Sequence, residues 1–284
     1  MNTYDDYFET KEGYKLSCRI YEKPEAQFTF LVLHGHGEHT GRYEKFAKIL
    51  EDHPISIAMF NMRGYGNSEG PEVYVDSYNE YIEDVSTFHK YIVEKYHLPK
   101  KVILFGHSMG GLIALYWLRT KSADVKALIL SSPCLGLILP KAFKCINELF
   151  NLFVPRLLYR NPVYPPHLTH NLEEVERYRK DPLIKRKMSV RLLSQLCHFA
   201  SGYFPGSEEV FDFPVYVLMS GLEKVVDKEK TKRVFEAIDS PQKELVCFDG
   251  FYHEIFNELE QEKAFAKLDE FLTEIYAYYQ TETK

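Results

Sequence analysis

A single stretch, residues 101–118, constrains the fold of this chain more than any other. An apolar run at 102–105 leads into the pentapeptide GHSMG at 106–110, and a strongly apolar segment with helical spacing follows at once. This pattern predicts a buried strand, a sharp turn and a helix. In a turn of the form Gly-x-Ser-x-Gly, the serine takes a strained conformation that lifts its hydroxyl clear of the sheet. We therefore predict that Ser108 is a nucleophile.

Short apolar strands alternate with helical segments on both sides of this unit. A strand hairpin is expected at 7–21, with further strands at 27–33, 55–60 and 125–130 and helices at 41–50 and 77–96. Near the C-terminus the pattern indicates strands at 214–220 and 244–248 and helices at 228–238 and 254–279. Such alternation is typical of an α/β protein with a mainly parallel central sheet covered by helices on both faces.

The segment 134–213 interrupts the alternation. Prolines recur between Pro140 and Pro182, and residues 143–159 are rich in aromatic and aliphatic side chains. We predict that 134–213 is an inserted lid over a core formed by 1–133 and 214–284. The mixed helical phase leaves two interpretations open, because the apolar side chains of the lid can either seal the core or face lipid.

Charge and cysteine content exclude several classes of protein. The chain has 35 Lys and Arg against 41 Asp and Glu, and no basic stripe is visible, so we expect no nucleic-acid partner. The five cysteines are scattered without Cys-x-x-Cys spacing, which indicates neither a disulfide framework nor a zinc site. The acidic, polar start of the chain is unlike a secretory signal, and there is no apolar run long enough to span a bilayer. We expect a cytoplasmic protein.

A serine nucleophile requires a base, an acid that orients the base, and hydrogen-bond donors for the oxyanion. His253 follows the last predicted strand and is the candidate base. The acid should lie between Ser108 and His253, after the strand at 214–220, where Glu223 and Asp227 both stand. The backbone N–H of Met109, directly after the serine, is the first candidate oxyanion donor.

Five motifs carry a family resemblance. They are GHSMGG at the elbow, HGHGEHTGRY and MRGYGNSEGP after two earlier strands, DPLI at 181–184 and GFYHE at 250–254. Together they resemble monoacylglycerol lipases and lysophospholipases of the α/β-hydrolase superfamily, and the likeness runs from Tyr4 to the last helix. It implies an α/β-hydrolase fold, places the acid at Glu223 rather than Asp227, and makes the His36 amide the second oxyanion donor.

The resemblance implies a serine hydrolase that cleaves esters of single-chain lipids, with either a glycerol or a phosphoglycerol head group. The proposed chemistry requires no metal or organic cofactor. On the interpretation in which the apolar side chains of the lid face lipid, the lid would contact membrane surfaces transiently and the protein would be peripheral at membranes. The alternatives are a generalist carboxylesterase or aminopeptidase of the same fold, and a non-catalytic hydrolase-like receptor. A metal cluster of His34, His36 and His39 is a further alternative, although no carboxylate or cysteine partner is evident for it.

Overall fold

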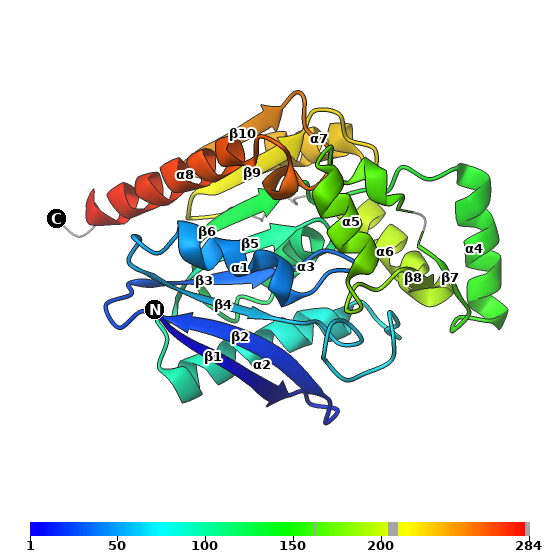
Figure 1. Ribbon diagram of the computed structural model, residues 1–284, viewed down its shortest axis with the longest axis horizontal. Helices are drawn as coiled ribbons and strands as arrows, with labels where there is room; N and C mark the ends of the chain where they lie inside the picture. The colour runs from blue at the N-terminus through cyan, green and yellow to red at the C-terminus, as the bar shows by residue number, and fades with distance from the viewer. Residues whose placement is uncertain (162, 204–209, 282–284) are drawn as a thin grey trace.

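A central sheet of eight strands organises the computed structural model, which describes residues 1–161, 163–203 and 210–281 (Figure 1). The strand order is β1-β2-β4-β3-β5-β6-β9-β10. In chain order the strands are β1 (Asn2–Glu9), β2 (Lys15–Glu22), β3 (Phe28–Leu33), β4 (Ile55–Phe60), β5 (Lys101–His107), β6 (Asp124–Ser131), β9 (Val215–Ser220) and β10 (Lys243–Phe248). The hairpin β1–β2 joins the sheet antiparallel to β4, and every pair from β4 to β10 is parallel.

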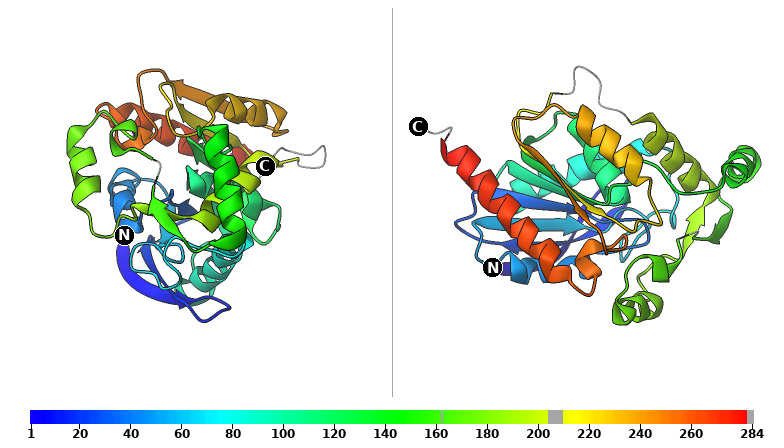
Figure 2. Two further views of the ribbon diagram at one scale, coloured as in Figure 1. Left: turned by 90° about the vertical axis from the view of Figure 1, so that its right-hand side faces the viewer. Right: turned by 90° about the horizontal axis from the view of Figure 1, so that it is seen from above.

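Helices cover both faces of this sheet (Figures 1 and 2). One face carries α1 (Glu44–Ile49) and α8 (Gln261–Thr281), and the other carries α2 (Asn79–Tyr96), α3 (Met109–Leu118) and α7 (Lys228–Ala237). Successive residues of β3 alternate between the two hydrophobic clusters, because Phe30 belongs to the α8 side and Leu31 to the α3 side. Burial on both faces explains why these strands are apolar throughout. The predicted two-sided, mainly parallel sheet is confirmed.

The segment predicted as a lid contains its own small set of elements. These are α4 (Lys141–Phe153), β7 (Leu158–Arg160), a 3-10 turn η2 (Pro165–His167), α5 (Leu172–Lys180), β8 (Lys187–Ser189) and α6 (Val190–Gly202). They lie beyond the carboxyl ends of the parallel strands, with α4 farthest from the sheet (Figures 1 and 2). β7 and β8 pair with each other in a separate ribbon, and α6 packs against α3. We call 134–213 the insert below.

The predicted closing helix is wrong at its start. A 3-10 turn, η3 (Ile255–Asn257), precedes α8, which begins at Gln261. Side chains hold the intervening chain out of a helix: the Glu258 carboxylate accepts hydrogen bonds from the backbone N–H groups of Tyr252 and His170. The predicted helix at 41–50 likewise begins as a 3-10 turn, η1 (Thr40–Tyr43). In the described ranges no helix has the length and apolar character needed to cross a bilayer.

Candidate active site

Ser108 occupies a strained turn between β5 and α3. Its φ and ψ are 51° and −116°, a combination that costs a residue with a side chain roughly 1–3 kcal/mol. The flanking glycines make the turn possible: a Cβ at Gly110 would lie 2.2 Å from the carbonyl oxygen of Leu33. A Cβ at Gly106 would lie 2.7 Å from the carbonyl oxygen of Gly110. Close packing of the helix start against β5 and β3 therefore fixes where the serine hydroxyl points.

Three predicted residues from distant parts of the chain form a continuous hydrogen-bonded chain. Nε2 of His253 lies 3.0 Å from Oγ of Ser108, and Nδ1 of His253 lies 2.9 Å from Oε2 of Glu223. The side chains of His253 and Glu223 are 3% and 2% exposed. Since a carboxylate can only accept, Nδ1 carries the proton and Nε2 is left to accept from the serine hydroxyl. This is the arrangement in which an imidazole can take a proton from serine.

The Glu223 carboxylate is held on both of its oxygens. Oε1 accepts hydrogen bonds from the backbone N–H groups of Lys224 and Val225, at 2.9 and 2.8 Å, while Oε2 faces His253. Burial raises the pKa of Glu223, but His253 and the backbone amides of Val225 and Val226 outweigh burial and hold the pKa below its usual value. The competing carboxylate of Asp227 is turned away and caps α7 by accepting from the N–H of Lys230 at 3.0 Å.

The same contacts act on the base. Burial lowers the pKa of His253, but the Glu223 carboxylate outweighs burial, aided by Glu254 and Glu38, and the net shift is upward from the usual value. A raised pKa means that the imidazolium formed after proton transfer from Ser108 is stabilised. The site therefore favours the charge separation that attack by serine would create.

Both predicted oxyanion donors border the same cavity as Ser108. Met109 is the first residue of α3, so its amide has no partner inside the helix. Within the described residues the amide of His36 donates no hydrogen bond either. The loop of His36 lies directly against the elbow, since a Cβ at Gly35 would be 3.3 Å from Cβ of Ser108. These two amides are thus available to a ligand atom beside the serine hydroxyl.

The cavity around Ser108 is narrow, mostly apolar and partly roofed by the insert. Its free space is about 40 Å³, which holds roughly three water molecules. The insert contributes Cys134, Leu137, Val163, Leu168, Met188 and Leu196 to the walls. Met109 and Val225 are the lining apolar side chains from the core. The site is therefore preformed at the reacting atoms, and the insert narrows the space above them.

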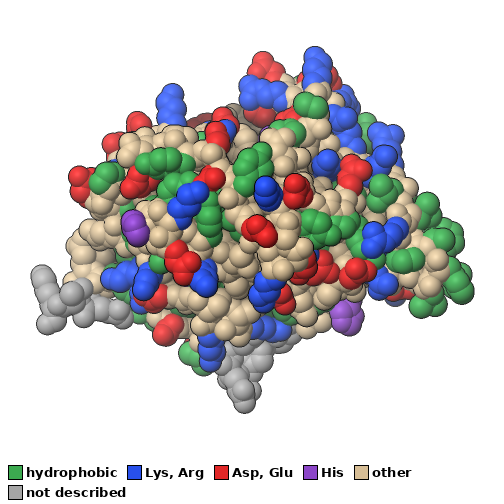
Figure 3. Space-filling model, turned by 90° about the horizontal axis from the view of Figure 1, so that it is seen from below, with side chains coloured by type: hydrophobic (Ala, Val, Ile, Leu, Met, Phe, Trp, Pro, Cys, Tyr) green, Lys and Arg blue, Asp and Glu red, His purple; other side chains and the backbone are tan. Residues whose placement is uncertain are grey.

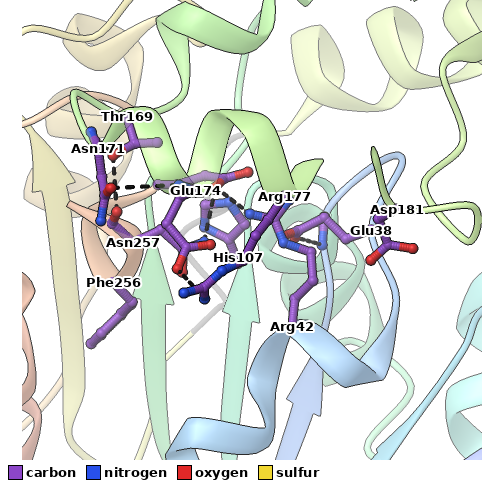
Figure 4. A network of polar contacts seen from close by, with 12 residues as sticks. Glu38, Arg42, His107, Thr169, Asn171, Glu174, Arg177, Asp181, Phe256 and Asn257 are labelled. Atoms are coloured by element: carbon purple, nitrogen blue, oxygen red, sulfur yellow. Dashed lines mark hydrogen bonds and ion pairs between the residues drawn. The ribbon is translucent and has the colours of Figure 1, made fainter. Parts of the chain in front are cut away.

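A buried charge cluster adjoins the cavity and was not anticipated from the sequence. The Arg42 guanidinium contacts Glu254 at 2.5 Å and Glu38 at 3.5 Å, and its side chain is 10% exposed. Its guanidinium also lies over the Tyr178 ring, 5.1 Å from the centroid. Figure 4 shows Arg42 and Glu38 near α5, which approaches from the insert. Burial raises the pKa of Glu38, but Arg42 outweighs it and lowers the pKa to about 2, so the Glu38 carboxylate stays charged beside Arg42.

The three histidines of the loop after β3 turn to three different partners. Nδ1 of His34 donates to the carbonyl oxygen of Gly35 at 2.8 Å, because its Nε2 accepts the N–H of Met62. His36 contacts the Tyr65 hydroxyl, and His39 contacts Asp181. A metal cluster would require the three imidazoles to face one common point. They instead face three different partners.

Sequence reasoning also assigned no role to His107 and Glu254, although both line the cavity. The ring of His107 lies 5.0 Å from that of His253, centroid to centroid. His107 is next to Ser108 in the sequence and Glu254 is next to His253. This adjacency was the sequence feature that could have pointed to them, but adjacency alone does not show which neighbour of a site residue points into the cavity.

Comparisons with known proteins agree with this geometry. Residues 24–260 match the profile of a hydrolase family described as "Serine aminopeptidase, S33". The chain is 31% identical over 241 residues to phospholipase YtpA of Bacillus subtilis, covering 83% of this chain and 91% of the relative. It is also 31% identical over 255 residues to human monoglyceride lipase, covering 87% of this chain and 82% of that protein.

A solved structure extends the likeness to three dimensions. The crystal structure of Paleococcus ferrophilus monoacylglycerol lipase superposes with a TM-score of 0.77 at 26% identity, covering 97% of this chain and all of that one. The predicted α/β-hydrolase fold and the predicted resemblance to monoacylglycerol lipases are confirmed. With the profile spanning most of its length, the chain belongs to the serine aminopeptidase S33 family of α/β-hydrolases.

Proposed function

We propose that this protein is a serine hydrolase that cleaves carboxylic esters of single-chain lipids of the monoacylglycerol or lysophospholipid type. The observation that carries the proposal is the buried chain from Ser108 through His253 to Glu223, with bonds of 3.0 and 2.9 Å, at the floor of an apolar cavity. Relatives named as a phospholipase and as monoglyceride lipases support the lipid ester as substrate.

In the proposed reaction, Oγ of Ser108 attacks the ester carbonyl carbon while Nε2 of His253 takes the hydroxyl proton. The amides of Met109 and His36 hold the negative oxygen of the tetrahedral intermediate. Protonated His253 then gives its proton to the leaving alcohol, and an acyl-serine remains. Water activated by the same imidazole hydrolyses this ester, which releases the fatty acid and restores the serine. Glu223 orients His253 and stabilises its charged form.

Access to the site requires movement of the insert. A cavity with room for roughly three water molecules cannot hold an acyl chain, and side chains from the insert line it. Opening of the insert would expose the apolar walls to the substrate. Closing of the insert over the bound substrate would then exclude water from the site. We therefore assign the insert the role of a lid.

Peptide hydrolysis is the main alternative, because the family profile is named for an aminopeptidase. Recognition of a free amino terminus would require an uncompensated acidic pair near Ser108. The carboxylates beside the cavity, Glu38 and Glu254, are both paired with Arg42, and Glu38 also accepts from the Tyr43 hydroxyl. Both carboxylates are therefore engaged by groups of the protein itself rather than turned toward Ser108 as a free pair, which favours an ester substrate without an ammonium group.

A substrate panel tests the proposed function. The protein should be labelled at Ser108 by a fluorophosphonate probe and should release fatty acid from monoacylglycerol or lysophosphatidylcholine. Hydrolysis of an aminoacyl anilide should be slower by orders of magnitude. Preference for the anilide would establish the peptidase alternative, and absence of labelling would favour a receptor without catalysis. Equal rates on short and long acyl esters would indicate a generalist carboxylesterase.

The exposed face of α4 is the proposed contact with a membrane. Apolar side chains there include Leu152 and Phe153, which are 74% and 75% exposed. Others on and beside the helix are Ile138, Ile146, Leu149, Phe150, Val154 and Leu157. Figure 3 shows hydrophobic surface gathered at the edge of the molecule where α4 lies, with basic side chains beside it. An exposed patch of this kind marks an interaction site.

The charge around this face favours an anionic lipid surface. Between residues 138 and 160 the chain carries Lys141, Lys144, Arg156 and Arg160 but a single acidic residue, Glu148, while the whole protein has a net charge of −6. Basic residues flanking an exposed apolar helix add about 1 kcal/mol each at an anionic bilayer. We propose that α4 docks the protein on such a surface, where the lipid substrate resides.

Vesicle binding checks this contact. The double variant Leu152→Ser/Phe153→Ser should bind phosphatidylglycerol vesicles roughly 10- to 100-fold more weakly, because two side chains no longer insert. Binding of the unaltered protein should weaken with added salt and be weaker on phosphatidylcholine. Hydrolysis of a short, soluble ester should not change.

A matched control uses Leu172 at the start of α5, whose exposure is also 74%. The Leu172→Ser variant should bind vesicles like the unaltered protein. Equal losses in both variants would mean that α4 has no special role, and undiminished binding of the double variant would refute the proposed contact.

A further inference from the structure

The loop that carries the proposed oxyanion donor, residues 34–38, is built on glycines. His36 stands between Gly35 and Gly37, and Gly37 has a φ of +85°. Glycine gives the backbone wide conformational freedom, so a Gly-His-Gly segment is poorly fixed by its own chain. An oxyanion donor, in contrast, must be aimed to within a fraction of an ångström. Hydrogen bonds, both within the loop and to other parts of the chain, have to supply that rigidity.

Two of these contacts hold the peptide before His36. The Gly35 N–H donates to Oε2 of Glu38 at 2.8 Å, and the Gly35 carbonyl accepts from His34. A third contact comes from the insert, where the N–H of Lys185 donates to the Gly37 carbonyl at 2.9 Å. This third contact is lost if the insert moves away to admit substrate.

A fourth contact runs from the His36 side chain to the core. Nδ1 of His36 lies 2.7 Å from the Tyr65 hydroxyl, and the two rings meet edge to face with centroids 5.6 Å apart. Tyr65 is fully buried. Burial lowers the pKa of His36 to about 4, although the backbone of Lys187 opposes the shift, so the imidazole stays neutral near pH 7. The bond therefore persists over the pH range in which a serine hydrolase works.

The partner of this bond is itself immobile. Tyr65 belongs to the loop after β4, whose neighbouring Arg63 makes two hydrogen bonds to the buried Asp84, at 2.7 and 2.6 Å. Gly64 packs so closely that a Cβ would lie 2.2 Å from the carbonyl oxygen of Pro71. Tyr65 thus presents its hydroxyl from a fixed part of the core that does not depend on the insert.

We propose that His36 and Tyr65 form a positioning pair that anchors the oxyanion loop to the core and keeps the His36 amide aimed while the insert opens. This proposal rests on the proposed function. It gives the His36 side chain a role that is separate from that of its amide. The amide would bind the oxyanion, and the imidazole would hold the amide in place through Tyr65.

A double-mutant cycle tests the pair. Tyr65→Phe and His36→Leu each remove the bond and leave the amide, so each should lower kcat for a soluble ester roughly 10- to 100-fold with little change in KM. The double variant should lose no more than either single one, since the bond can be lost only once. His36→Asn, whose side-chain amide can reach the place of Nδ1, should recover much of the rate.

A trifluoromethyl ketone forms a tetrahedral adduct with the serine. The affinity for this compound should not change if the bond between His36 and Tyr65 only stabilises the fold. If the bond positions the amide, the affinity should fall by the same factor as kcat/KM, while fatty-acid product binds as before. Tyr216→Phe is the control, because Tyr216 is also fully buried and its hydroxyl donates to Glu274 on the other face of the sheet. That variant should lose stability without losing transition-state affinity.

Two results would refute the proposal that His36 and Tyr65 form a positioning pair. One is a Tyr65→Phe protein that melts lower but retains kcat and analogue affinity, which would make the bond structural only. The other is full additivity of the two single losses. Fluorophosphonate labelling of the unaltered protein distinguishes either result from failure of the proposed function. If the unaltered enzyme is labelled and active, and Tyr65→Phe has no effect on its activity, the positioning pair is refuted while the proposed function stands.

Discussion

A Ser108→Ala variant is expected to lose roughly six orders of magnitude in ester turnover, because removing the nucleophile removes the covalent route altogether. The variant should also resist fluorophosphonate labelling. The fold should survive, since alanine occupies the same turn with less bulk. Fatty-acid release, labelling and thermal unfolding measured on one preparation check all three expectations. Turnover within a hundredfold of the unaltered enzyme would show that Ser108 is not the nucleophile.

A companion variant, Ser108→Gly, separates chemistry from backbone strain. It should be as inactive as Ser108→Ala, because both lack the hydroxyl. It should also be more stable by about 1 kcal/mol, since a φ of 51° strains a residue with a Cβ but not glycine. Denaturant unfolding of the two variants measures the difference. Equal stability would mean that the elbow stores no strain at this position.

A Glu223→Gln variant is expected to lose on the order of 10⁴-fold in turnover. The amide of glutamine can donate to Nδ1 of His253, which favours the tautomer whose Nε2 carries the proton and cannot accept from Ser108. The variant also loses the charge that stabilises the imidazolium. The loss should appear in kcat, because Glu223 lies behind His253 and does not line the cavity. Retained turnover would remove Glu223 from the proposed triad.

The pH dependence gives this variant a second signature. The base must be neutral to act, so kcat/KM should rise with pH through the pKa of His253, and the raised pKa puts this limb above the usual histidine value. In Glu223→Gln the principal cause of the upward shift is gone, and the limb should move to lower pH. A limb that stays in place would show that Glu223 does not set the pKa of the base.

Asp227→Asn is the matched control for Glu223→Gln. It removes a carboxylate four residues further along but keeps a good N-cap for α7, because asparagine caps helices as well as aspartate does. Its turnover and pH profile should match those of the unaltered enzyme. A large loss of turnover here would revive Asp227 as the triad acid.

Most of the fold could be predicted from the sequence because the strands of this sheet are buried on both faces. Short apolar runs such as 55–60 and 102–105 have few alternatives to a buried parallel strand once helical segments separate them. The order of strands could not be read from these runs, because each is equally apolar. The start of α8 also escaped prediction, because the carboxylate of Glu258 bonds to distant backbone amides and holds that segment as a loop.

The site residues likewise divide into those that the sequence predicted and those that it could not predict. Motif spacing pointed to Ser108 and His253, because a nucleophile elbow and a histidine after the last strand carry their signals locally. The choice between Glu223 and Asp227 needed a resemblance to other proteins, since both stand after the same strand. Nothing local predicted that Arg42 pairs with Glu254, more than two hundred residues away.

The sequence by itself determined the alternation of strands and helices, the elbow, and the choice of Ser108 and His253 as the proposed nucleophile and base, because each depends on neighbours along the chain. Only the tertiary structure decided which side chains meet. It turned Glu223 toward His253 and Asp227 toward the start of α7, enclosed Arg42 between two carboxylates, and set His36 against Tyr65. These contacts join segments far apart in the chain, so their distances follow from the packing of the whole sheet and its helices.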